Sequence, residues 1–183
     1  EKRGRKGFWT MSDAWFDDAW EPTTSARHDK DNDGLWTQMQ VGAWALAYGA
    51  TGDPAFCEKA RRAIGTMLLQ IDIPAVDFEA AGLGRGFVTR SLVRDDEGDV
   101  FTGKATQPNW HLVHWTDGHD YYWKDDTSSD ETTGHFFGYP LYYDLCADDD
   151  EKAAIADRVG ALAGTILEHD FRLVDLDGEQ TSH

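Results

Sequence analysis

The sequence lacks the features that would quickly assign it to a membrane or nucleic-acid-binding class. Its 183 residues contain no apolar run close to the roughly 20 residues that a membrane-spanning helix needs. Basic residues are few, 17 against 34 acidic ones, which gives a formal net charge of −17. An acidic surface of this kind repels phosphate groups, so we expect neither a nucleic acid nor a membrane as partner.

Sequence signatures of metal and nucleotide sites are also missing. The only two cysteines, Cys57 and Cys146, each fall inside a helical pattern and do not have metal-ligand spacing. We expect two buried free thiols, with a disulfide as the alternative. The glycines of residues 82–86 fit neither a phosphate loop nor a dinucleotide fingerprint, so we expect no nucleotide.

Aromatic side chains are abundant: the chain has 8 Trp, 9 Phe and 6 Tyr. Many of them stand beside Asp, Gly, His or Asn rather than in apolar runs. Rings next to hydrogen-bonding groups suit the faces of sugars, although Trp is also a common core residue. The composition therefore favours a carbohydrate as partner.

The hydrophobic pattern predicts four helices in two similar pairs. Residues 35–49 are apolar on nearly every side, which is typical of a helix that is buried all round. Residues 54–71 are apolar on one face only. Residues 131–146 and 150–169 repeat this order of a buried inner helix and an amphipathic outer helix. We therefore expect two antiparallel hairpins with the N-termini of both inner helices on one rim.

Local signals support the starts of the second pair. Ser128 with Glu131, and Asp148 with Glu151, have the spacing of capping boxes. Residues 72–126, between the pairs, show no helix pattern, and residues 87–94 read as a β-like run. A loop of this length inside a compact domain is usually functional.

Three motifs carry a resemblance to a known family: Asp31-Asn-Asp-Gly-Leu-Trp-Thr37, Ala50-Thr-Gly-Asp-Pro54, and Asp126-Thr-Ser-Ser-Asp-Glu131 with Gly134-His-Phe-Phe137. They resemble the six-hairpin glycosidase-like proteins, whose (α/α)6 toroids include glycoside hydrolases and polysaccharide lyases. Gly86-Phe-Val-Thr-Arg-Ser91 looks like the substrate-rim segment between hairpins of such proteins. The resemblance covers roughly residues 27–178.

This resemblance implies an all-α fold of antiparallel helical hairpins, with a long loop and short β insertion between them. We expect an N-terminal loop segment at 1–26 and a toroid-type domain at 27–183, with hairpins at about 34–71 and 130–169. Because only two hairpins are evident, the toroid is incomplete, and we expect the rest of a longer parent chain as a partner.

Asp33 and Asp130 occupy equivalent positions ahead of the two inner helices. Glycosidic cleavage needs one carboxylic acid and one carboxylate, so we predict that this pair faces a common cleft. The alternative is that both residues only cap their helices. His135, one turn into its helix, is a candidate base, with a buried structural histidine as the alternative.

Candidate substrate-binding residues surround this pair. Trp36 and Trp123 flank the two acidic motifs and would stack on sugar rings, although core packing is an alternative for Trp36. Arg90 would bind a uronate carboxylate or a phosphate through its guanidinium fork, with a surface ion pair as the alternative. The other candidates are polar residues of the second motif: Asp126, Ser129 and Glu131.

We expect no cofactor, and the chain offers two metal patterns as weaker alternatives. Asp29, Asp31 and Asp33 match the opening of a calcium loop, but the twelfth position is Gln40 rather than Glu. Four histidines could form a metal site, but no pair has the spacing of a helical zinc motif: His111, His114, His119 and His135.

These observations predict an enzyme that cleaves glycosidic bonds in a poly- or oligosaccharide, one with acidic sugars, in an extracellular or periplasmic location. One alternative is a polysaccharide lyase, in which a His or Tyr base removes the proton next to a uronate carboxylate and Arg90 neutralises that carboxylate. The other is a non-catalytic carbohydrate-binding or scaffold domain.

Overall fold

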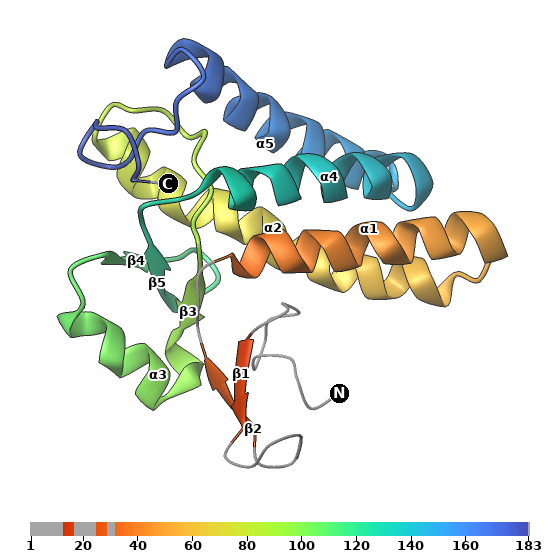
Figure 1. Cartoon of the computed structure of the whole chain (residues 1–183), viewed down its shortest axis with the longest axis horizontal. Coiled ribbons are helices and arrows are strands. Elements are labelled where there is room, and N and C mark those ends of the chain that lie inside the picture. The colour runs from red at the N-terminus through yellow and green to blue at the C-terminus, as the bar shows by residue number, and fades with distance from the viewer. Residues whose placement is uncertain (1–12, 17–24, 29–31, 183) are drawn as a thin grey trace.

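The computed structural model describes residues 13–16, 25–28 and 32–182. This part of the chain is mostly helical, with a small three-stranded antiparallel sheet packed at one end (Figure 1). The long helices are α1 (Asp33–Thr51), α2 (Ala55–Ala80), α4 (Ser129–Leu145) and α5 (Asp149–Glu168). None of the described helices is long and apolar enough to cross a membrane.

The two predicted hairpins are confirmed. α1 packs on α2 and α4 packs on α5, and each inner helix starts within two residues of its predicted position. α2, however, continues to Ala80 instead of ending at residue 71, although Pro74 lies inside it. The added turns bury Ile73 and Phe78 against the sheet. That apolar burial outweighs the backbone hydrogen bond that a proline removes.

The inner helices α1 and α4 lie side by side and run in the same direction (Figure 1). Glycines set how closely they approach. A Cβ added at Gly134 would collide with the backbone of Leu35, and one at Gly138 would collide with Gln38 further along. On the other helix, a Cβ at Gly42 would meet the ring of Phe137. The N-termini of both inner helices therefore lie on one rim, as predicted.

A β structure stands between the hairpins, where a long loop with a short β insertion was predicted, so the fold is mostly helical with a small sheet rather than all-α. Strands β3 (Leu92–Arg94), β5 (Asp120–Lys124) and β4 (Trp110–His114) form an antiparallel sheet in that order. Two further strands, β1 (Asp13–Phe16) and β2 (Ser25–His28), pair with each other.

Of the β-like run predicted at 87–94, only its last three residues form a strand. β3 pairs with β5, with Leu92 opposite Trp123. The chain between β3 and β4 forms two short 3-10 helices, Asp95–Glu97 and Gly103–Thr106, and the four-residue helix α3 (Asp99–Thr102), which lies on the side of the sheet away from the hairpins (Figure 1).

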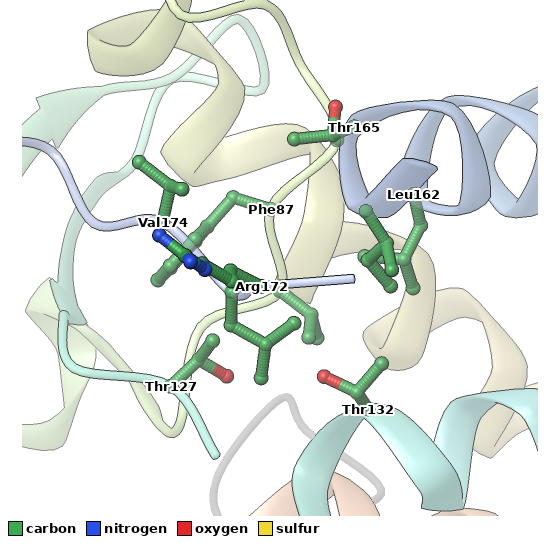
Figure 2. Close-up of a pocket in the computed structure, with 11 residues that line it drawn as sticks. Phe87, Thr127, Thr132, Leu162, Thr165, Arg172 and Val174 are labelled. Atoms are coloured by element: carbon green, nitrogen blue, oxygen red, sulfur yellow. The ribbon is translucent and has the colours of Figure 1, made fainter. Parts of the chain in front are cut away.

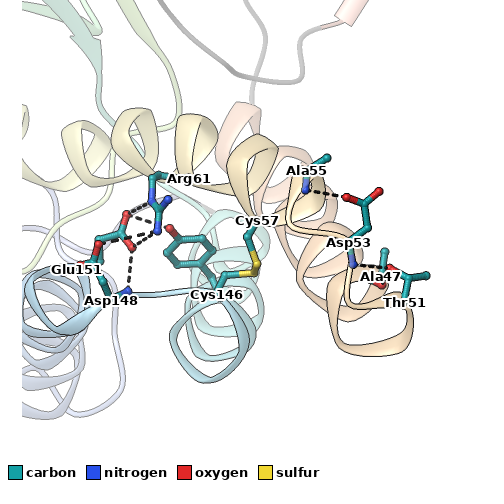
Figure 3. The surroundings of a disulfide bond; sticks show 10 residues. Ala47, Thr51, Asp53, Ala55, Cys57, Arg61, Cys146, Asp148 and Glu151 are labelled. Atoms are coloured by element: carbon teal, nitrogen blue, oxygen red, sulfur yellow. Dashed lines mark hydrogen bonds and ion pairs between the residues drawn. A yellow bond between two sulfur atoms is a disulfide. The ribbon is translucent and has the colours of Figure 1, made fainter.

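Cys57 and Cys146 form a disulfide, so the prediction of two free thiols is wrong (Figure 3). Cys57 lies in the first turn of α2, and Cys146 follows the last residue of α4. The parallel packing of α1 and α4 brings these two ends together, although 89 residues separate them in the sequence. The bond therefore ties the two hairpins at the end opposite the rim.

Candidate functional site

The N-termini of α1 and α4 are joined by side chains, and we call this meeting point of residues 32–35 and 128–131 the rim. The Ser128 hydroxyl donates to Asn32 Oδ1 at 2.9 Å and accepts from the backbone N–H of Glu131 at 3.2 Å. The Glu131 side chain does not turn back to Ser128, as a complete capping box would. Its Oε2 instead accepts from the backbone N–H of Leu35 in α1 at 3.2 Å. The predicted capping box is therefore half formed, and its glutamate joins the two helices.

The structure places the predicted pair, Asp33 and Asp130, in different environments. Asp33 is buried, and its Oδ2 accepts from the hydroxyl of Ser91 at 2.6 Å. Asp130 lies on the exposed side of the first turn of α4. Neither residue lines the cavity shown in Figure 2 or the pocket beside the disulfide. The carboxylate of α4 that reaches the start of α1 belongs to Glu131, the residue after Asp130.

Beneath the rim lies a buried polar layer, formed by Gln38, Gln70, Glu131 and His135. The two ring nitrogens of His135 lie 3.2 Å from Gln38 Nε2 and 3.2 Å from Gln70 Oε1. Gln38 donates to Nδ1, so Nε2 carries the proton and donates to Gln70. Burial lowers the pKa of His135 to about 3, because the charged imidazolium would lose its hydration. The structure thus supports the alternative of a buried structural histidine.

Gly34 is the residue that makes room for this layer. A Cβ at this position would collide with Glu131 Oε1, Gln70 Oε1 and the Nε2 of His135. No residue larger than glycine fits there without displacing the polar side chains. The Asp-Gly pair at the start of α1 therefore has a packing reason, independent of any catalytic role.

The two candidate sugar-stacking tryptophans are not equivalent. Trp36, on α1, is 55% exposed and presents its ring to solvent. Trp123, on β5, is 0% exposed and packs against Phe78 and Phe87, and its Nε1 donates to Asp77 Oδ2 at 2.7 Å. The interpretation of Trp123 as a sugar-stacking residue is therefore wrong for this structure, because its ring is part of the core.

Arg90 and Asp126 hold the loop that leads into α4. Arg90 is 6% exposed, and its Nη1 donates to the backbone carbonyl of Asp126 at 3.2 Å. Asp126 has a positive φ of 52°, and its carboxylate accepts from both the N–H and the hydroxyl of Ser182. Its own N–H donates to Asp175 Oδ2 at 2.8 Å. Ser129, the next candidate, lies on the exposed surface.

A His–Asp pair that no sequence pattern indicated lies beside this loop. His111 on β4 is half-buried, and its Nε2 lies 2.9 Å from Asp125 Oδ2. The imidazole also stacks on Trp123, with ring centroids 4.4 Å apart. A carboxylate only accepts, so Nε2 carries a proton, and in the neutral form of the ring Nδ1 holds the lone pair. Only the pairing of β4 with β5, which the sequence pattern did not predict, brings these residues together.

Neither metal alternative gains support from the described residues. Of the proposed calcium ligands, Asp29 and Asp31 lie outside them, and Asp33 binds Ser91. Within the described residues no group of three or more His, Cys, Asp or Glu side chains could hold a metal ion. Three of the four histidines instead form separate pairs with aspartates: His111–Asp125, His114–Asp120 and His119–Asp95.

No protein-family model, curated protein or solved structure matches this chain.

Proposed function

We propose that this chain is part of a carbohydrate-active enzyme of the six-hairpin, (α/α)-toroid type, and that it acts on a poly- or oligosaccharide at the rim. The observation that carries the proposal is the joining of two parallel inner helices at their N-termini by Asn32, Ser128 and Glu131. The positive ends of both helix dipoles meet there, beside the exposed Asp130 and Ser129.

The open side of α1 supports further hairpins beyond the two described. α1 carries no charged residue after Asp33. α4 and α2 cover only part of its surface, and the large apolar side chains Trp36, Met39 and Leu46 are exposed. Phe137 continues this apolar surface on α4, where its partly exposed ring lies over Gly42 of α1. A helix that is apolar all round is typical of a buried one, so additional inner helices would fit this face.

Hydrolysis is the reaction that we favour, with Asp130 as one of the two carboxyl groups. Asp130 is the member of the predicted pair that a substrate can reach, and Trp36 offers an exposed ring on the neighbouring helix. The net charge of −17 opposes the approach of a strongly acidic polymer. A neutral or weakly acidic glycan is therefore the better substrate for this surface.

Elimination is the second candidate, and the His111–Asp125 pair is the observation that favours it. Nδ1 of an oriented, half-buried imidazole can accept the C5 proton next to a uronate carboxylate. The electron pair of that C–H bond then forms the C4–C5 double bond, the C4–O bond of the glycosidic link breaks, and the leaving oxygen takes a proton from water. Arg90, the predicted partner of the uronate, is buried beneath the loop at Asp126 and would have to be uncovered.

A panel of neutral and acidic polysaccharides with two readouts tests both reactions. New reducing ends without ultraviolet absorbance indicate hydrolysis, whereas absorbance from an unsaturated product indicates elimination. Asp130→Asn should abolish the first activity and His111→Gln the second. His114→Gln is the matched control, because His114 also pairs with an aspartate, Asp120, but is far more exposed. Turnover that survives both variants would contradict these assignments.

A non-catalytic carbohydrate-binding or scaffold domain remains the third candidate. The burial of Asp33, Glu131 and His135 favours it, because these side chains already have structural partners. It is the better reading if glycans bind, Asp130→Asn leaves that binding intact, and no glycan is turned over. For all three candidates the disulfide supports an extracellular or periplasmic location, because such bonds persist in oxidising compartments.

A further inference from the structure

A small cavity lies directly behind the loop that leads into α4 (Figure 2). Thr127 and Thr132 line it on one side, α5 closes another side, and residues 172–174 of the C-terminal segment lie across it. The space that it offers to the centre of a water molecule is about 10 Å³. That is close to the smallest space that holds one water, so the cavity excludes a sugar or a phosphate.

The two threonine hydroxyls at this cavity differ in their hydrogen bonds. Thr132 Oγ1 donates to the backbone carbonyl of Ser128 at 3.1 Å, so its hydrogen is used and its lone pairs remain to accept. Thr127 is 1% exposed, and its Oγ1 has no hydrogen-bond partner among the described residues. Figure 2 shows the two hydroxyl oxygens turned toward one another. A buried hydroxyl without a partner is costly, and such a group usually bonds to protein or to ordered water.

We infer that this cavity is a binding site for one ordered water molecule. The water accepts a hydrogen bond from the Thr127 hydroxyl and donates one to Thr132 Oγ1, which in turn donates to Ser128. This chain of bonds links the loop before α4 to the first turn of the helix. The inference does not depend on the proposed function.

The surroundings favour a water that stays in place. The C-terminal segment is fixed over the cavity, because the N–H of Thr181 donates to the carbonyl of Leu173 at 2.9 Å and Val174 forms a β-bridge with Gln180. On the opposite side Gly86 fits closely against Thr165 of α5, where a Cβ would collide. A water held in this way fixes Thr127, and with it the loop between β5 and α4.

The sign of the stability change caused by Thr127→Val distinguishes a hydrated cavity from a dry one. Valine has the shape of threonine but cannot bind the water, so the unfolding equilibrium constant should rise about tenfold in a urea titration. If the cavity is dry, the same change removes a buried, unpaired hydroxyl and makes the protein more stable, which would overturn the inference.

A crystal structure at high resolution gives the direct readout. Wild-type protein and the Thr127→Ser variant, which keeps the hydroxyl, should show one water within hydrogen-bond distance of residues 127 and 132. Thr127→Val should lack it. Absence of the water from the wild-type structure would overturn the inference whatever the effect of valine on stability.

Discussion

Glu131 Oε2 accepts a hydrogen bond from the backbone N–H of Leu35 at 3.2 Å, although 96 residues separate the two in the sequence. A helix N-terminus leaves its first N–H groups without intrahelical partners. The Glu131 side chain of α4 thus caps the N-terminus of the neighbouring helix α1, while α4 itself is capped by Ser128. This bond connects the two hairpins at the rim.

Glu131→Ala should therefore destabilise the protein much more than Asp130→Ala. The first change leaves the part-buried N–H of Leu35 without its acceptor and should cost about 1–3 kcal/mol of unfolding free energy. The neighbouring Asp130 is exposed, so its replacement should change stability by about 0.5 kcal/mol or less. Urea unfolding of both variants measures the difference, and equal effects would contradict the capping of α1 by Glu131.

The sequence predicted the helices better than it predicted the site. Periodicity and capping spacing locate α1, α2, α4 and α5, because each depends on neighbours within a few residues. The full box of Asp148 and Glu151 forms as predicted. The Ser128–Glu131 spacing is equally typical of a box, yet the glutamate side chain binds α1. Local spacing cannot reveal an acceptor that serves a distant helix.

The missed features all depend on contacts that are distant in the sequence. Cys57 and Cys146 meet only because α1 and α4 pack in parallel. His111 meets Asp125 only because β4 pairs with β5. Trp123 alternates with partly buried positions on a short strand, and its full burial follows from the extension of α2 beyond residue 71. Residues 72–126 gave no pattern strong enough to place any of these elements.

The close approach of α1 and α4 predicts opposite effects for two glycine-to-alanine changes. Gly134→Ala drives a Cβ into the backbone of Leu35, which cannot move aside, and should cost about 1–3 kcal/mol. Gly160→Ala on α5 meets nothing within 4 Å and should stabilise the protein by roughly 0.5–1 kcal/mol, because alanine favours a helix. Thermal unfolding of the two variants, with far-ultraviolet circular dichroism of each at low temperature, checks the signs. Tolerance of Gly134→Ala would contradict the packing of the inner helices.

Removing the disulfide should lower stability without removing the helices. A cross-link that closes a loop of this length is worth about 4 kcal/mol when it restricts the unfolded chain. The exposed bond from Arg61 to Glu151, close by in Figure 3, is too solvent-accessible to replace it. The double variant Cys57→Ala with Cys146→Ala should therefore unfold at lower urea concentration and keep its circular dichroism spectrum. Alkylation of two thiols in unreduced, denatured wild-type protein would show that the bond does not form.

The last prediction concerns pH and the buried imidazole of His135. Burial lowers its pKa to about 3 in the folded protein, while an unfolded histidine has a pKa of about 6.5. Between these values the unfolded state binds a proton that the folded state does not, so unfolding free energy must fall as pH falls. The loss begins near pH 6.5 and approaches about 1.4 kcal/mol per pH unit from this residue alone. His135→Gln removes the titrating ring, so its urea midpoint should depend less on pH between about 6.5 and 5. Identical pH dependence in the two proteins would mean that His135 binds a proton as readily in the folded state as in the unfolded one, and would contradict the lowered pKa.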